Sequence, residues 1–242
     1  MLVLSEPSIR YKYASCRLYY RPLAGAGVEG GIDRNISRGN KVVELKFSAL
    51  SPYVRKVNMV AHEHGLAERL RLTLVNTRTE AEKIAPHNPL GKIPVLITDS
   101  GATIYDSPVI CEYLDAEFGN HRLLAASGSR RWQTMTMVAL ADGLLDAALL
   151  VRQERARPAA EQSGEWTELQ LGKVHRALGY FEGVVDSFGP ELDMAQVGVG
   201  AAVGYIPLRL LDFDGLPKWP KLKAWYATQS LRPSFKNTAP VL

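Results

Sequence analysis

The chain has 242 residues, of which 46% are hydrophobic and 22% are charged, so it can form one or two globular domains. It contains no run of 18 apolar residues, and we therefore expect no membrane span. Its two cysteines, Cys16 and Cys111, exclude a disulfide framework or a cysteine-based zinc site and favour a reducing compartment, the cytoplasm. The net charge of +4 does not favour a nucleic-acid partner, because residues 42–242 contain 22 basic and 22 acidic residues.

The first 41 residues hold seven Lys and Arg against three Asp and Glu, and therefore the whole net charge. The glycine-rich stretches LAGAGVEGG and NISRGNK show no hydrophobic period. We expect residues 1–41 to be an extension that is disordered or that follows from a start codon placed too far upstream. An organellar presequence is an alternative, but it should be poorer in acidic residues.

From residue 42 to residue 120 the pattern alternates between strands and helices. VVELKF and LRLTLV alternate as strands do, and the helix PYVRKVNMVAHEHG between them ends at Gly65. Thr79 and Glu82 have the spacing of a capping box. IPVLIT and ATIYD are two strands joined by the turn DSG.

The last element of this half is a helix, SPVICEYLDAEFG, for which we expect Ser107 as N-cap and Pro108 at the first helical position. The order β-α-β-α-β-β-α opens with a parallel strand pair and closes with an antiparallel hairpin. This order is that of a thioredoxin-type domain, which we place at residues 42–120.

From residue 127 to residue 242 the sequence predicts helices alone. RRWQTMTMVALADGLLDAALLVRQERARP and EWTELQLGKVHRALGYFEGVVDSFG each carry a helical hydrophobic stripe, and AQVGVGAAVGYIPLRLLDF is apolar on all sides, as a buried helix is. The fold class is therefore α/β followed by all-α: a thioredoxin-like domain, then an all-helical domain.

Four stretches resemble the soluble glutathione transferases: FSALSPYVRKV, NPLGKIPVL, DSPVICEYL and PSFKNTAP. The resemblance covers about residues 42–240, and it is greatest to a bacterial branch whose members often lack an assigned substrate. It implies a homodimer that binds glutathione as co-substrate and acts on a small electrophile, with no metal. The chain departs from the pattern where Asp193 and Gln196 replace the usual helix-opening pair, but both can serve in a cap.

Ser51 has two interpretations. Serine followed by proline is an ordinary helix start. In the family it resembles, however, the same position would hold the glutathione sulfur, with the hydroxyl donating a hydrogen bond to the thiolate. Ser48 is the alternative donor. Arg55 and Lys56 lie in the first helical turn, where cations are unfavourable, although a solvated lysine there costs little.

The resemblance implies partners for the rest of the tripeptide. Asp106 can pair the γ-glutamyl ammonium, and Ser107 with its helix N-terminal amides can bind the adjacent carboxylate. Ile93, before a cis Pro94, would leave backbone groups free for the cysteinyl segment. Lys92 is a candidate for the glycyl carboxylate, unless it is only a solvated lysine.

Two other functions remain open. One is a glutathione-dependent isomerase of the maleylacetoacetate type, although the loop SALSPYVR lacks that group's paired serine and cysteine. The other is a non-catalytic family member that binds a protein. The sequence does not identify the electrophile, whose site we expect at the loop after the first strand and on the helix near Leu145 to Arg155.

Overall fold

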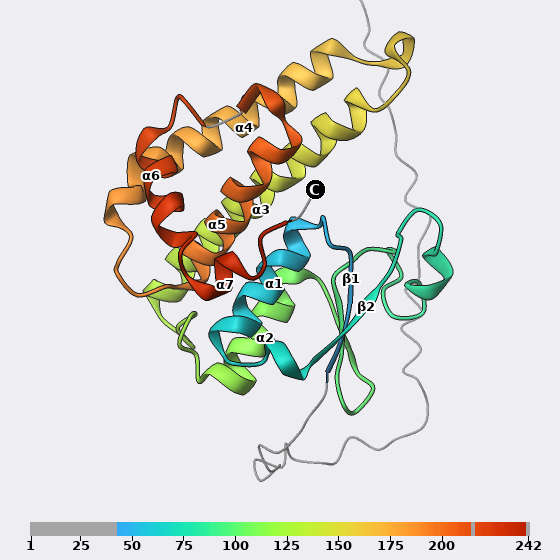
Figure 1. The fold of residues 1–242 in the computed structure, drawn as a ribbon, viewed down its shortest axis with the longest axis vertical. Helices are drawn as coiled ribbons and strands as arrows, with labels where there is room; N and C mark the ends of the chain where they lie inside the picture. Colours follow the sequence, from blue (N-terminus) through green and yellow to red (C-terminus); the bar gives the residue numbers. More distant parts are fainter. Residues whose placement is uncertain (1–42, 214–215, 241–242) are drawn as a thin grey trace, which may run out of the picture. The chain divides into compact units, whose positions relative to one another are not determined.

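The computed structural model describes residues 43–213 and 216–240, and the predicted extension at residues 1–41 lies outside them. Its strands are β1 (Val43–Phe47), β2 (Leu70–Leu74), β3 (Val95–Ile97) and β4 (Thr103–Ile104). Its α-helices are α1 (Pro52–Glu63), α2 (Ser107–Gly119), α3 (Ser129–Arg155), α4 (Gly164–Val184), α5 (Met194–Arg209), α6 (Pro220–Gln229) and α7 (Pro233–Lys236) (Figure 1). Short 3-10 helices lie at Ala67–Arg69, Ala81–Lys83, Ala159–Glu161, Val185–Ser187 and Leu211–Phe213.

The four strands form one sheet in the order β2-β1-β3-β4. β1 and β2 are parallel, whereas β3 runs antiparallel to both β1 and β4. A β-α-β unit followed by a hairpin is the arrangement that the sequence predicts, so the thioredoxin-like fold is confirmed, and the region after it is helical as expected.

Two predicted caps differ from the structure. Ser107 is the first residue of α2, and Asp106 occupies the N-cap position without a side-chain cap bond. Thr79 caps nothing; instead the carboxylate of Glu80 accepts a hydrogen bond from the backbone N–H of Asn76 at 2.8 Å. The N-cap of α2 is thus one residue before the predicted Ser107, and that of the 3-10 helix at Ala81–Lys83 is Glu80, one residue after the predicted Thr79.

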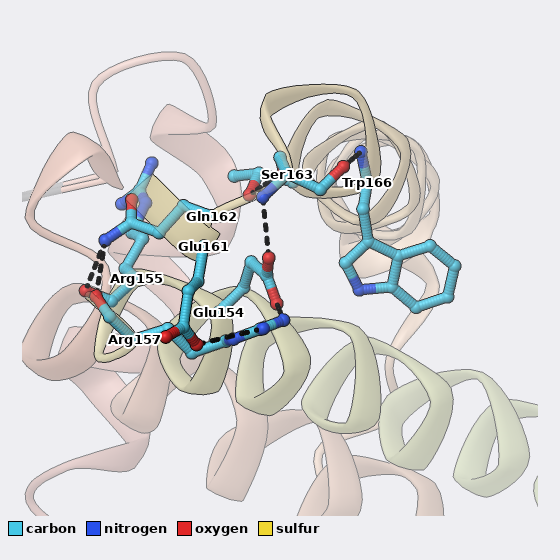
Figure 2. A network of polar contacts seen from close by, with 8 residues as sticks. Glu154, Arg155, Arg157, Glu161, Gln162, Ser163 and Trp166 are labelled. Atoms are coloured by element: carbon cyan, nitrogen blue, oxygen red, sulfur yellow. Dashed lines mark hydrogen bonds and ion pairs between the residues drawn. The ribbon is translucent and has the colours of Figure 1, made fainter. Parts of the chain in front are cut away.

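The helical region is built on α3, which packs against α4 and α5. By length and composition alone α3 could cross a membrane, but the core helix of a folded protein passes the same test. Figure 2 shows the polar network that closes the connection from α3 to α4. Glu154 accepts a hydrogen bond from the backbone N–H of Ser163 at 2.7 Å, and Ser163 caps α4 by accepting from Trp166 N–H at 3.2 Å.

Helix α5 is buried on nearly every side, and three of its glycines let neighbours approach closely. A Cβ on Gly198 would lie 3.4 Å from Ala141, one on Gly200 would lie 2.3 Å from the Phe235 ring, and one on Gly204 would lie 2.1 Å from Arg55 Nη1. Each of these glycines therefore allows a neighbouring segment to pack closely against α5.

Replacing Gly200 by alanine should lower the free energy of unfolding by about 1–3 kcal/mol, because the new methyl group overlaps a buried ring. Gly143 on α3 is the matched control, since a Cβ there meets nothing within 4 Å. Gly143→Ala should instead stabilise the protein by about 0.5–1 kcal/mol through helix propensity. Urea unfolding of both variants measures the contrast; equal effects would contradict the packing role of Gly200.

Candidate functional site

The predicted site residues follow or precede strands at one edge of the sheet. Lys46 pairs with Val95, and Leu96 pairs with Ile104. Because β1 and β4 run in the same direction and β3 runs opposite, the carboxyl ends of β1 and β4 meet the amino end of β3 at this edge. The loop after β1, the Ile93–Pro94 segment and the start of α2 are therefore neighbours.

Ser51 is the N-cap of α1, and its Oγ accepts a hydrogen bond from the backbone N–H of Val54 at 3.3 Å. A hydroxyl that accepts in this way still carries its own proton. The side chain can therefore cap the helix and donate a hydrogen bond to another group at the same time. Its backbone N–H donates to the carbonyl of Ser48 at 3.2 Å, which closes the turn before the helix.

Ser48, the alternative donor, lies half-buried in that turn. A small cavity opens beside Ser51, and Ser48 does not line it. The lining residues come from the turn, α1, α5 and the C-terminal segment: Ala49, Leu50, Ser51, Pro52, Arg55, Ala201, Tyr205 and Pro240. Of the two serines, the geometry thus places Ser51 at the cavity.

The other predicted residues surround the same edge. The Ile93–Pro94 peptide is cis, with Pro94 buried and Ile93 half-buried. Asp106 is exposed just before α2, whereas Ser107 is 2% exposed. Lys92 has an exposed side chain, and its backbone carbonyl accepts a hydrogen bond from Asn88 at 2.9 Å.

The first turns of α1 contain two cations that are buried rather than solvated, contrary to the interpretation of Lys56 as a solvated lysine. The side chain of Lys56 is 0% exposed, and its Nζ lies 2.6 and 2.8 Å from the two carboxylate oxygens of Asp142 on α3. Arg55 is 6% exposed. The sequence showed that these two cations lie at the unfavourable N-terminal end of a helix. It could not show what compensates them, because their hydrogen-bond partners are more than 80 residues away along the chain.

Two tyrosines add to this surface, and the sequence did not indicate either of them. Tyr53 donates a hydrogen bond to Asp146 Oδ1 at 2.5 Å, and burial together with this carboxylate raises the pKa of Tyr53, so its hydroxyl remains a donor. Burial also raises the pKa of Tyr205, although the neighbouring cations Arg152 and Arg209 act in the opposite direction. Arg152 lies in the α3 segment that was predicted to shape the electrophile site.

Two further groups are structural. Cys111 is fully buried, and burial raises the pKa of its thiol to about 12. His64 Nε2 lies 3.0 Å from Asp115 Oδ1. Within residues 43–213 and 216–240, no group of three or more His, Cys, Asp or Glu side chains could hold a metal ion.

Comparison with known proteins gives matches along most of the chain. A family model described as the glutathione S-transferase N-terminal domain matches residues 50–117. The uncharacterized GST-like protein YibF of Escherichia coli (strain K12) is 33% identical over 201 residues, which are 82% of this chain and 98% of that protein.

Solved structures are similar over the same extent. A glutathione transferase family member from Pseudomonas fluorescens Pf-5 with bound glutathione has a TM-score of 0.79 and 38% identity, over 83% of this chain and 100% of that one. A structure from the same organism with bound S-(propanoic acid)-glutathione has a TM-score of 0.75 and 37% identity, over 82% of this chain and 100% of that one.

Proposed function

This chain belongs to the glutathione transferase family, and we propose that it is an enzyme of that family in which Ser51 activates the thiol of glutathione for attack on a small electrophile. The observation that carries the proposal is the geometry of Ser51. Its oxygen is already an acceptor within the helix cap, so the hydroxyl proton is free to be donated into the adjacent cavity.

Glutathione, when bound, supplies the sulfur nucleophile. A free thiol has a pKa of about 8.5, so only a few per cent of it is thiolate at neutral pH. The Ser51 hydroxyl favours the thiolate by a charge-assisted hydrogen bond, worth about 1.5–3 kcal/mol or one to two pKa units. The N-terminus of α1 adds partial positive charge at the same place.

The residues at this edge of the sheet suit the remaining groups of the tripeptide. The exposed carboxylate of Asp106 can pair an ammonium group. The first amides of α2, beginning at Ser107, can bind a carboxylate. The backbone of Ile93 and the exposed side chain of Lys92 can supply further polar partners. The relatives from Pseudomonas fluorescens with bound glutathione and with a glutathione thioether support this use of the site.

The test is a titration with glutathione followed by activity measurements on a panel of electrophiles. We expect saturable binding, and we expect Asp106→Asn to weaken it by about tenfold because one ion pair of the ligand is lost. Glu117→Gln, an exposed carboxylate at the other end of α2, is the control and should bind as the parent does. Binding without turnover of any electrophile would favour a non-catalytic role.

We also propose that the protein is a homodimer, in which the thioredoxin-like domain of one protomer packs on the helical domain of its partner. Sedimentation equilibrium at micromolar concentration should give a mass near twice the 26.7 kDa of the chain. A monomer mass under these conditions would contradict the proposal.

A further inference from the structure

Arg55 is a buried cation to which the described part of the chain offers no anion. Its Nη2 donates to two neutral oxygens, the Tyr226 hydroxyl at 3.2 Å and the Phe235 carbonyl at 3.4 Å. Its Nε and Nη1 are buried and have no hydrogen-bond partner. Within residues 43–213 and 216–240 it forms no ion pair, whereas buried charges are ordinarily paired.

The fold makes room for this guanidinium. Gly204 on α5 lies against Arg55, and a Cβ at that position would lie 2.1 Å from Nη1 and 2.2 Å from the Tyr226 hydroxyl. A side chain at residue 204 would therefore displace the guanidinium from its place. The burial of this positive charge costs free energy of folding, and the close packing of α5 at Gly204 keeps the guanidinium in its place.

The position of Arg55 explains what the charge can act on. Ser51, the N-cap of α1, is four residues before Arg55, whose backbone N–H donates to the Ser51 carbonyl at 3.0 Å. Both residues line the same small cavity. A charge in this region of low exposure interacts more strongly with a neighbouring anion than a solvated charge does.

Among the described residues that line the cavity, Arg55 is the one charged side chain, and two carboxylates on α3 that contact α1 have partners of their own. On α3, the carboxylate of Asp142 is bound by Lys56 and that of Asp146 by Tyr53. Tyr205 on the cavity wall has the cations Arg152 and Arg209 beside it, and Tyr226 accepts from Arg55 itself. Asp106 is an exposed carboxylate just before α2. Among the residues that the structure describes, none of these groups forms an ion pair with Arg55.

We propose that the guanidinium of Arg55 is the counter-charge for the anionic sulfur of glutathione held at Ser51. This inference rests on the proposed function, because it requires glutathione in the site. In this scheme Arg55 stabilises the negative charge across the cavity, while the Ser51 hydroxyl makes the hydrogen bond. A cation that was costly to bury in the free protein is thereby compensated when the thiolate is present.

The experiment compares two ligands that differ in charge at the sulfur position. Glutathione sulfonate carries a permanent negative charge there, and S-methylglutathione carries none. Calorimetry gives the affinity of each for the parent protein, Arg55→Met, Arg55→Lys and Arg157→Met. Arg157, in the α3–α4 connection (Figure 2), does not line the cavity, so its variant controls for loss of one positive charge.

We expect the parent and Arg157→Met to prefer the sulfonate, and Arg55→Met to lose about tenfold of that preference while its affinity for S-methylglutathione stays within about threefold. Arg55→Lys, which keeps the charge, should restore most of the preference. The pKa of bound glutathione, followed by thiolate absorbance, should rise by about one unit in Arg55→Met, since one unit corresponds to tenfold. A thermal melt in parallel verifies that each variant is folded.

Two results would overturn the inference. One is an unchanged sulfonate preference in folded Arg55→Met. For the other, the same calorimetry is carried out with S-(2-carboxyethyl)glutathione and S-propylglutathione. If Arg55→Met lost only its preference for the carboxyethyl ligand, Arg55 would be assigned to an acidic electrophile instead of the sulfur. If the parent bound neither glutathione nor S-methylglutathione, the proposed function itself would fail, which is a different outcome from either of these.

Discussion

Replacing Ser51 by alanine should raise the pKa of the bound glutathione thiol by about one to two units, since one charge-assisted hydrogen bond to the thiolate is lost. At neutral pH the thiolate fraction, and with it kcat/KM, should fall by about 10- to 100-fold. The rising limb of the pH–rate profile should shift to higher pH by the same number of units. Affinity for glutathione should weaken only modestly, because Asp106, Ser107 and Ile93 are unchanged.

The same variant also removes the cap of α1, in which Ser51 Oγ accepts from Val54 N–H. Cap loss should lower the free energy of unfolding by about 0.5–2 kcal/mol, and urea unfolding separates this effect from the change in thiol pKa. Ser51→Thr keeps the hydroxyl and the cap, so it should retain most of both properties. If Ser48→Ala raises the thiol pKa and Ser51→Ala does not, Ser48 is the donor and the assignment to Ser51 is wrong.

Local patterns carried enough information for the order of elements. Val43 to Phe47 and Leu70 to Leu74 alternate in polarity, and both form strands. Asp193 was predicted to cap α5, and its carboxylate does accept from Gln196 N–H at 2.9 Å. The Gln196 side chain, however, donates to the carbonyls of Gly189 and Glu191 instead of returning to the cap. Capping is local, whereas the direction of a long side chain depends on the loop that surrounds it.

The contents of the site were harder to predict, because they depend on contacts between distant segments. Ser51 and Asp106 could be named from the residues beside them. The burial of Arg55 could not, since Tyr226 and Phe235 lie 171 and 180 residues further along the chain. From the sequence, the position of Arg55 in the first turns of a helix indicated only that its charge is unfavourably placed there, not which residues surround it.

Separating Lys56 from Asp142 should cause the largest loss of stability that a single substitution produces in this region. Lys56 on α1 is completely buried, and Asp142 on α3 is its only carboxylate partner among the described residues. Asp142→Asn leaves a buried ammonium without an anion, which should lower the free energy of unfolding by about 3–5 kcal/mol. Lys56→Met should cost less, because the side chain of Asp142 is 19% exposed and can remain partly hydrated.

The two partners should also differ in their response to pH. Burial raises the pKa of Asp142 even though Lys56 acts in the opposite direction, and removing Lys56 should raise it further. A carboxyl group with a raised pKa binds its proton more readily in the folded state than in the unfolded state. The stability deficit of Lys56→Met should therefore shrink as the pH falls from 7 toward the ordinary aspartate pKa of about 3.9, whereas that of Asp142→Asn should not.

The double variant Lys56→Met/Asp142→Asn tests whether the two losses have one origin. It contains neither unpaired charge, so it should be more stable than Asp142→Asn alone, and the double-mutant cycle should give a coupling of about 1–3 kcal/mol. Urea unfolding of the parent and the three variants at pH 7 and pH 5 gives the free energies of unfolding from which the cycle is calculated. Losses that simply add, or a Lys56→Met deficit that grows on acidification, would show that this pair does not join α1 to α3 as a buried ion pair.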